Sequence, residues 1–385
     1  LEFRRVLFRS SEGITLNNIG SVYSRLGQYP DALDYYKQSL VIREDLSDRR
    51  GEGITLNNIG SIYSRLGDYP QALDFYEQAF AIRETIGDRQ GISESLNNIG
   101  SIHSRLGDYP KALDFYEQSL TMRRDLSDRR GESVMLNNIG GVYERLGESP
   151  KALNYYEQSL AITEEIGDRR GIGQSLNNLG SLYSRLGEYS QALDYYQRSL
   201  AILKQIGDRR GEAVILNNLG NIYSRLGKYS QALAFYEQSL AIREEIDDRR
   251  GEGLMLSNLG NLYARLGDDS QALTFYERAL VIREEINDRR GVGESLNNIG
   301  SLHDSQGDYP QALASYEQSL AIRREIGDRR GEAVMLNNIG SVYSRLAKYP
   351  KALDYYERSL AIRTEIGDRR GKGVMLNNIG SVYSR

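Results

Sequence analysis

Hydrophobic residues recur at helical spacing along the chain, in two runs per unit that are separated by a short polar stretch. In the first unit these runs are Leu16, Ile19, Val22, Tyr23 and Leu26, then Ala32, Leu33, Tyr36, Leu40 and Leu46. Apolar residues three and four positions apart lie on one face of an α-helix. The pattern therefore predicts pairs of amphipathic helices joined by short turns.

The helix pair repeats every 40 residues, and the register never changes. Nine full units occupy residues 11–370, and residues 371–385 contain the first helix of a tenth, truncated unit. A fixed period of this length is typical of solenoids, because one helix pair cannot bury its apolar face alone. We therefore expect an all-α solenoid, although 385 residues alone would indicate two or three domains. Residues 1–10 do not fit the repeat, and we expect this stretch to be foreign or truncated.

Turn-forming residues fall at fixed positions of the repeat. A repeat position is named after its residue in the first unit, so the Pro30-type position comprises Pro30 and the residues at 40-residue intervals after it. All six prolines occupy this position, which we expect to be the first residue of the second helix. The other three units have serine there, which we expect to cap that helix: Ser190, Ser230 and Ser270.

The junction between units has its own signals. The Ser47-type position contains only Gly, Ser, Asp or Asn, the residues that tolerate a left-handed helix end. Asp48 and its equivalents follow, where each aspartate is placed to cap the next helix. We therefore assign a structural role to the segment Asp48–Arg50. Glycine fills all ten Gly20-type positions, which predicts a close approach to the Ala32-type position of the second helix.

The motif that these residues form resembles the tetratricopeptide repeat, whose pattern is W-x2-L-G-x2-Y…A-x3-F…P: Leu16-x2-Ile19-Gly20-x2-Tyr23, then Ala32-x3-Tyr36. The resemblance covers residues 11–385, with leucine in place of Trp and no closing proline. The long period is similar to that of the Pins/LGN scaffolds and of bacterial multidomain proteins, and the LNN opening resembles kinesin light chain repeats. The resemblance implies a right-handed superhelix of tandem helix-turn-helix units with a concave, peptide-binding groove.

The helical wheel places a polar surface opposite the packing face of the first helix. At 100° per residue, Ile14, Asn18, Ser21 and Arg25 lie within roughly 40° of the direction opposite Leu16. Stacked units would align such residues into rows. Asparagine fills every Asn18-type position, and we take all ten as candidate peptide-binding residues: Asn18, Asn58, Asn98, Asn138, Asn178, Asn218, Asn258, Asn298, Asn338 and Asn378.

Arginine fills nine of the ten Arg25-type positions, with Ser305 as the exception, and eight are candidates for the same site: Arg25, Arg65, Arg105, Arg145, Arg185, Arg225, Arg265 and Arg345. Amides can hydrogen-bond to a peptide backbone, and arginine forms charge-assisted bonds to carboxylates. Two alternatives stay open: the asparagines could bond to a neighbouring helix, and the arginines could pair with nearby acids. The Ile14-type position varies, with Glu94, Gln174 and Glu294 in three units, and could read ligand side chains.

Composition and charge exclude several classes of protein. Cysteine is absent, so disulfides and thiolate metal sites are excluded. The net charge of −4 argues against a protein that binds polyanions over its whole surface. The two histidines, His103 and His303, occupy the Tyr23-type position, where we expect them to replace a core aromatic residue. No catalytic, phosphate-binding or metal motif stands out, so we expect no enzyme activity and no cofactor or metal. Without a signal peptide or membrane span, we expect a cytoplasmic protein.

These observations predict a non-enzymatic scaffold whose concave groove holds an extended, acidic peptide through the Asn18-type and Arg25-type rows. One alternative is a structural array that associates head to tail, because a truncated solenoid exposes an apolar packing face. A second is binding of single-stranded RNA, which helical repeats can read with a few side chains per unit. The net charge makes nucleic acid a poorer partner than protein or peptide.

Overall fold

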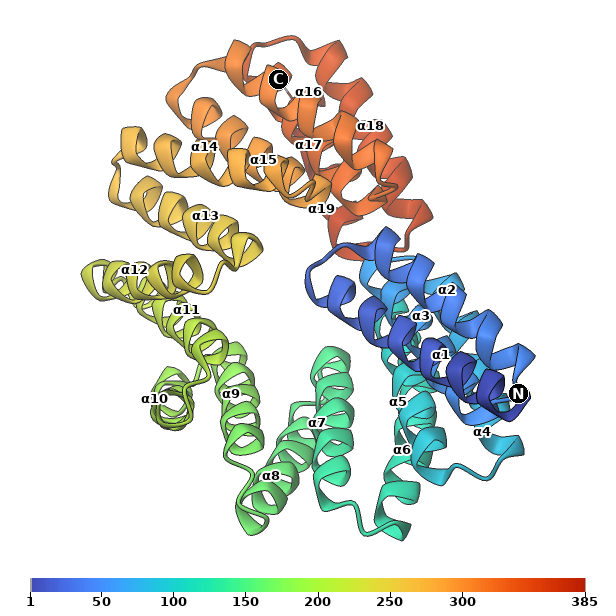
Figure 1. Ribbon diagram of the computed structural model, residues 1–385. Coiled ribbons are helices and arrows are strands. Elements are labelled where there is room, and N and C mark those ends of the chain that lie inside the picture. The colour runs from blue at the N-terminus through green and yellow to red at the C-terminus, as the bar shows by residue number, and fades with distance from the viewer. Residues whose placement is uncertain (1, 385) are drawn as a thin grey trace. The chain divides into compact units, whose positions relative to one another are not determined.

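The computed structural model describes residues 2–384, with side chains from Phe8 onward. The described chain is all α-helical, and its nineteen helices alternate between first and second helices of successive repeats (Figure 1). The first helices are α1(Glu2–Arg25), α3(Arg49–Leu66), α5(Arg89–Leu106), α7(Arg129–Leu146), α9(Arg169–Leu186), α11(Arg209–Arg225), α13(Arg249–Leu266), α15(Arg289–Gln306), α17(Arg329–Arg345) and α19(Arg369–Tyr383).

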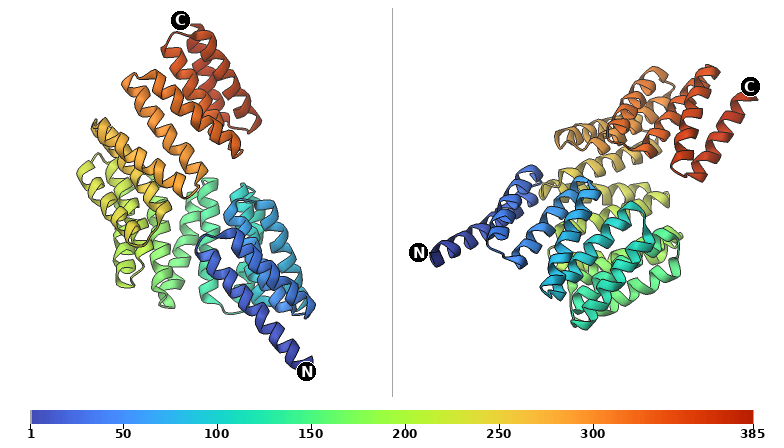
Figure 2. Two further views of the ribbon diagram at one scale, coloured as in Figure 1. Left: turned by 45° about the horizontal axis from the view of Figure 1, so that its top comes forward. Right: turned by 90° about the vertical axis from the view of Figure 1, so that its right-hand side faces the viewer.

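The second helices pack antiparallel to the first ones, as further views show (Figure 2). They are α2(Tyr29–Asp45), α4(Tyr69–Thr85), α6(Tyr109–Asp125), α8(Ser149–Glu165), α10(Tyr189–Gln205), α12(Tyr229–Glu245), α14(Asp269–Glu285), α16(Tyr309–Glu325) and α18(Tyr349–Glu365). The chain forms two compact parts, which we call the first unit, up to Ile206, and the second unit, from Gly207 onward. A single helix pair is called a repeat from here on. The predicted all-α solenoid of tandem helix-turn-helix units is confirmed. Residues 2–10 continue helix α1, and the expectation that residues 1–10 are foreign stays a prediction; Leu1 lies outside the described residues.

Within each unit the core is a series of similar clusters between consecutive helices. Ala32 and Tyr36 of α2 are buried against Ile59 and Ile62 of the next first helix, α3. The same arrangement recurs in the second unit, for example around Tyr276. The Val22-type position, to which Ile62 belongs, therefore packs on the preceding repeat. Because each cluster involves only neighbouring helices, stability is distributed along the stack rather than concentrated in one core.

The Gly20-type glycines lie where two helices approach most closely. A Cβ atom added to Gly20 would lie 2.8 Å from Cδ1 of Tyr36 and 3.2 Å from the carbonyl oxygen of Ala32. The predicted close approach is therefore present. Its tightest contact is the Tyr36 ring rather than the small side chain of Ala32.

The predicted caps at the unit junctions are confirmed. Oδ1 of Asp48 accepts a hydrogen bond from the backbone N–H of Gly51 at 3.0 Å, and the equivalent aspartates do the same before the later first helices. The residue before each of these aspartates has a positive φ, including the non-glycine residues Ser47, Ser127, Asp247 and Asn287. These left-handed residues end the second helices and turn the chain into the next repeat.

The prediction for the start of the second helices was wrong by one residue. Helix α2 begins at Tyr29 and its N-cap is Gln28, so Pro30 is the second helical residue. Ser190, Ser230 and Ser270 lie inside their helices, whose N-caps are the residues two positions earlier. The first-turn N–H groups of a helix have no intrahelical partner, so proline is tolerated at any of these positions. A proline therefore indicates the first turn of a helix but not which residue begins it.

Candidate functional site

Two polar rows lie on what we call the first-helix face, the surface of the first helices that carries the Ile14-, Asn18-, Ser21- and Arg25-type positions. In the first row, the side-chain amides of most Asn18-type residues bond to the preceding repeat. Nδ2 of Asn58 donates to Oδ1 of Asn17 at 3.0 Å. The same bond links Asn98 to Asn57, Asn138 to Asn97, Asn178 to Asn137, Asn258 to Asn217, Asn338 to Asn297 and Asn378 to Asn337, at 2.8–3.1 Å.

The two asparagines of one helix also bond to each other in several repeats. Nδ2 of Asn97 donates to Oδ1 of Asn98 at 3.4 Å, and the pairs at 217–218 and 337–338 repeat this contact. The result is an amide ladder in which each bond between repeats runs from an Asn18-type donor to an Asn17-type acceptor of the preceding repeat. The asparagines therefore bond to a neighbouring helix, which was one of the alternatives left open by the sequence. The Asn18-type side chains from Asn58 to Asn378 remain half-buried rather than fully covered. Because a primary amide has two N–H groups, one ladder bond leaves a second donor for a ligand.

The ladder is interrupted at Ser257. This serine occupies the Asn17-type position, and its Oγ is buried without a hydrogen-bond partner among the described residues. Ser257 as a whole is only 5% exposed. A shorter side chain therefore replaces the acceptor that Asn298 would use by analogy with the other repeats.

We expect Ser257→Asn to stabilise the second unit by about 1 kcal/mol, the typical net contribution of one restored hydrogen bond. The equivalent Asn217 accepts from Asn258 at 2.8 Å in a similar setting, which indicates that the site accommodates an amide. Urea unfolding followed by circular dichroism measures the change. Ser257→Ala serves as the control, because it removes an unsatisfied hydroxyl without adding an acceptor. If the alanine variant gains as much stability as the asparagine variant, the ladder bond is not the cause.

The second row consists of the exposed Arg25-type guanidinium groups, three of which contact the preceding repeat. Nη1 of Arg145 donates to the carbonyl oxygen of Ser104 at 3.1 Å. Arg185 forms an ion pair with Glu144 at 3.1 Å, and Arg345 pairs with Asp304. The other predicted arginines have no ion pair or hydrogen bond to any described residue: Arg25, Arg65, Arg105, Arg225 and Arg265. These five are available to bind an anion.

Buried tyrosines lie beneath the arginine row. The hydroxyl of Tyr236 donates to Oδ1 of Asn221 at 2.7 Å. The side chain at the Ser21-type position therefore accepts a hydrogen bond from the Tyr36-type hydroxyl in this repeat. Burial raises the pKa of Tyr236 to about 12, and Arg265 and Arg225 oppose that shift. The tyrosine therefore stays neutral, and the arginine charges are not compensated by a phenolate.

The acidic residues at the Ile14-type position have internal partners. Nη2 of Arg83 lies 3.5 Å from Oε2 of Glu94, and Nη2 of Arg283 lies 3.7 Å from Oε2 of Glu294. Most aliphatic residues of this position, for example Leu254, are exposed. A ligand would therefore meet apolar side chains in most repeats and a partly neutralised carboxylate in these two. The proposed role of this position in reading a ligand stays a prediction.

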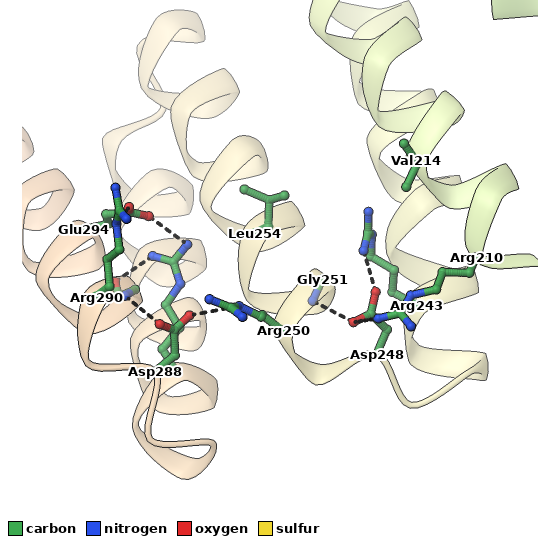
Figure 3. A pocket seen from close by; sticks show the side chains of 12 residues that line it. Arg210, Val214, Arg243, Asp248, Arg250, Gly251, Leu254, Asp288, Arg290 and Glu294 are labelled. Atoms are coloured by element: carbon green, nitrogen blue, oxygen red, sulfur yellow. Dashed lines mark hydrogen bonds and ion pairs between the residues drawn. The ribbon is translucent and has the colours of Figure 1, made fainter. Parts of the chain in front are cut away.

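A cavity of about 490 Å³ lies in the second unit at the N-terminal turns of α11, α13 and α15 (Figure 3). Its arginines come from two repeat positions, the Arg43-type and the Arg50-type: Arg243 and Arg283, and Arg210, Arg250 and Arg290. Val214 and Leu254 contribute apolar surface. Asp248, Asp288 and Glu294 also line it, which leaves two more basic than acidic side chains. A smaller cavity of about 250 Å³ occurs at the same repeat positions in the first unit, next to Arg123 and Arg130.

The sequence prediction did not include the Arg50-type residues in the site. Their segment was assigned a structural role, and part of it has that role: Asp128 caps α7, and Nη1 of Arg129 pairs with Glu132 at 2.5 Å. The missed signal is the i, i+4 spacing of Arg250 and Leu254, which places a cation and an aliphatic residue on one helix face.

The two histidines differ in their surroundings. His103 stacks on Phe115 with ring centroids 5.5 Å apart, as Tyr63 stacks on Phe75 in the preceding repeat. It therefore replaces an aromatic packing residue. His303 belongs to the repeat in which Ser315 takes the place of the stacking aromatic residue. The buried Nδ1 atoms of both histidines have no hydrogen-bond partner among the described residues. Across residues 2–384 no group of three or more His, Asp or Glu side chains is placed to hold a metal ion.

The repeats match a known family along nearly the whole sequence. The tetratricopeptide repeat profile matches residues 11–85, 55–125, 131–205, 171–245, 251–325 and 331–385. The chain therefore belongs to the tetratricopeptide repeat family, as the sequence motif predicted. No curated protein sequence is significantly similar to it. None of the described helices combines the length and the apolar character needed to cross a membrane.

Solved structures with the same fold include three that cover most of this chain. A Rap protein complexed with competence and sporulation factor has 16% sequence identity and a TM-score of 0.59, over 93% of this chain and 99% of that one. The Rap conjugation gene regulator of plasmid pLS20, in complex with the Phr* peptide, has 17% identity and a TM-score of 0.53, over 70% and 73%. A signal transduction ATPase with a tetratricopeptide repeat sensor, from Pyrococcus horikoshii, has 15% identity and a TM-score of 0.60, over 90% and 54%. At these identities the similarity establishes the fold alone.

Proposed function

We propose that the protein is a non-enzymatic scaffold that binds an extended, acidic peptide along the first-helix face. The observation that carries the proposal is the pair of polar rows, half-buried amides and exposed guanidinium groups, at one-repeat spacing. Amides bond to a peptide backbone whatever its sequence, and unpaired arginines favour ligands with carboxylates. The two Rap structures, one of which holds a peptide, support this function by analogy of fold.

Enrichment from a random peptide library at low and at high salt tests the proposal with the full chain. We expect acidic peptides to be enriched at low salt and lost at high salt, because exposed ion pairs are screened. Enrichment of no peptide at either salt concentration would overturn the proposal. Sedimentation at several protein concentrations tests the self-association alternative on the same sample.

The arginine row is tested by the triple substitution of Arg25, Arg65 and Arg105 to alanine. Each of these side chains is exposed and has no ion pair within the described chain, so the fold should not depend on it. We expect the affinity for an enriched acidic peptide to fall at least about tenfold, since an exposed ion pair contributes about 0.5 kcal/mol and three such pairs together about 1.5 kcal/mol. The matched control replaces Lys37, Arg198 and Arg358, which are exposed cations on second helices. An equal loss in both variants would indicate a non-specific charge effect.

A further inference from the structure

The arginine cavity of the second unit combines exposed cations with exposed aliphatic side chains. Arg210, Arg250 and Arg290 come from the same position of three successive repeats, and Figure 3 shows them around the opening beside Val214 and Leu254. The side chains of the three arginines are 76%, 77% and 72% exposed. Leu254 is 42% exposed although it is aliphatic. This mixture fits a ligand with both charged and apolar groups.

The exposed arginines retain most of their hydrogen-bonding capacity. Nη2 of Arg210 lies 3.8 Å from Asp248, Nε of Arg250 lies 3.7 Å from Asp288, and Nε of Arg290 lies 3.9 Å from Glu294. These separations exceed hydrogen-bond length, so the guanidinium N–H groups are free to form shorter bonds to an anion. In the first unit the equivalent Arg130 lies closer to its acid, with Nε 3.1 Å from Asp168.

The acids that line the cavity are already occupied by inner partners. Asp248 accepts from Arg243 at 2.6 Å and from the N–H of Gly251 at 3.1 Å. Asp288 accepts from the N–H of Gly291 at 3.0 Å. Asp248 is thus neutralised by Arg243, and Asp288 is held by a backbone N–H group. Glu294 lies 3.7 Å from Nη2 of Arg283, so the exposed charges at the opening are those of three arginines and of this one partly paired carboxylate.

We propose that this cavity anchors the peptide through two acidic residues about three positions apart, with an aliphatic residue between them. The two carboxylates pair with Arg250 and Arg290, and the aliphatic side chain packs on Leu254. Packed helices lie about 8–10 Å apart, and three residues of extended chain span about the same distance. Two separated monoanions suit the site better than one dianionic phosphate, which would approach the lining carboxylates as well as the arginines. This inference rests on the proposed peptide-binding function and specifies its ligand.

The test measures binding of a labelled peptide that contains Glu-Leu-Ala-Glu, by fluorescence anisotropy with the full chain. Two comparison peptides contain Gln-Leu-Ala-Gln and Glu-Ser-Ala-Glu. We expect the first to bind, the glutamine peptide to bind at least about a hundredfold more weakly because it loses both carboxylates, and the serine peptide to bind about threefold more weakly. The double variant Arg250→Glu, Arg290→Glu should lower the affinity at least about a hundredfold, since each arginine contributes about tenfold. Leu254→Ser should lower it about fivefold.

The control is the double variant Arg330→Glu, Arg370→Glu, which makes the same charge change at the same repeat position outside the cavity. It should retain the wild-type affinity within about twofold, because long-range charge effects are screened by salt. An equal loss in both double variants overturns the inference, as does equal binding of the glutamine peptide. Tighter, arginine-dependent binding of poly-uridine RNA would also overturn it. If the library yields peptides that do not depend on Arg250 and Arg290, the inference fails and the proposed function stands.

Discussion

Asp328→Ala should destabilise the second unit by about 3 kcal/mol, which is more than the loss expected from removing an ordinary helix N-cap. Asp328 accepts from the N–H of Gly331 at 2.8 Å and from Nη1 of Arg323 at 2.5 Å. Arg323 is only 7% exposed. Alanine removes the cap of α17 and leaves a buried guanidinium group without this carboxylate, and each of these changes is destabilising.

The matched control is Asp308→Ala in the same repeat. Asp308 also caps a helix, accepting from the N–H of Gln311 at 3.2 Å, but this bond is exposed. We expect a loss of about 1 kcal/mol, the usual contribution of an N-cap. Hydrogen exchange of the amides of α16 and α17 is the suitable measurement, because repeat arrays do not always unfold in one step. Equal losses in the two variants would show that the Arg323 pair contributes nothing beyond the cap.

The difference between the wild type and Asp328→Ala should depend on pH. Burial tends to raise the pKa of Asp328, but the N–H of Gly331 and the guanidinium of Arg323 outweigh it, so this pKa is lowered. The stabilisation is therefore fully present above the unfolded pKa of about 3.9 and is lost as the pH falls through the lower folded value. Below about pH 4 the two proteins should become progressively more alike. A constant difference down to pH 2 would contradict this assignment.

The repeat architecture could be predicted from the sequence because it depends on local signals. The 40-residue period, the two helices per unit, the aspartate caps and the close approach at Gly20 each follow from residue type and spacing. Proline and serine were misplaced by one or two residues because the first turn of a helix tolerates proline at several positions. Local patterns therefore identify the elements more reliably than their first residues.

The partners of the polar side chains could not be predicted in the same way. A helical wheel gives the direction in which Asn98 points, but not that its Nδ2 lies 2.8 Å from Oδ1 of Asn57 in the first helix of the preceding repeat. That distance depends on how neighbouring first helices stack. The same holds for Arg250, whose segment reads as a helix cap and charged loop until the structure places a cavity beside it. Side-chain function in a solenoid depends on the spacing between repeats, which is a tertiary property.

Gly260→Val should destabilise the second unit by about 3 kcal/mol or more, whereas Gly380→Val should have almost no effect. A Cβ atom at Gly260 would lie 2.5 Å from Cε1 of Tyr276, whose ring is buried among Ala272, Ile299 and Leu302. Moving this ring would disturb the cluster and the hydrogen bond from its hydroxyl to Asn261 at 2.8 Å. Overpacking of this kind typically costs 1–3 kcal/mol, and valine adds two further methyl groups.

Gly380 is the matched control because it occupies the same repeat position, and nothing described lies within 4 Å of its added Cβ. Valine is a better helix former than glycine, so this substitution should be neutral or slightly stabilising. Thermal unfolding followed by circular dichroism shows whether glycine is needed at this position for its backbone conformation or for close contact with the Tyr36-type ring. If both variants lose stability equally, backbone conformation determines the choice of glycine. If only Gly260→Val loses stability, the close contact with the Tyr36-type ring determines the choice of glycine. In that case the two helices of a repeat approach each other closely because glycine has no side chain at this position.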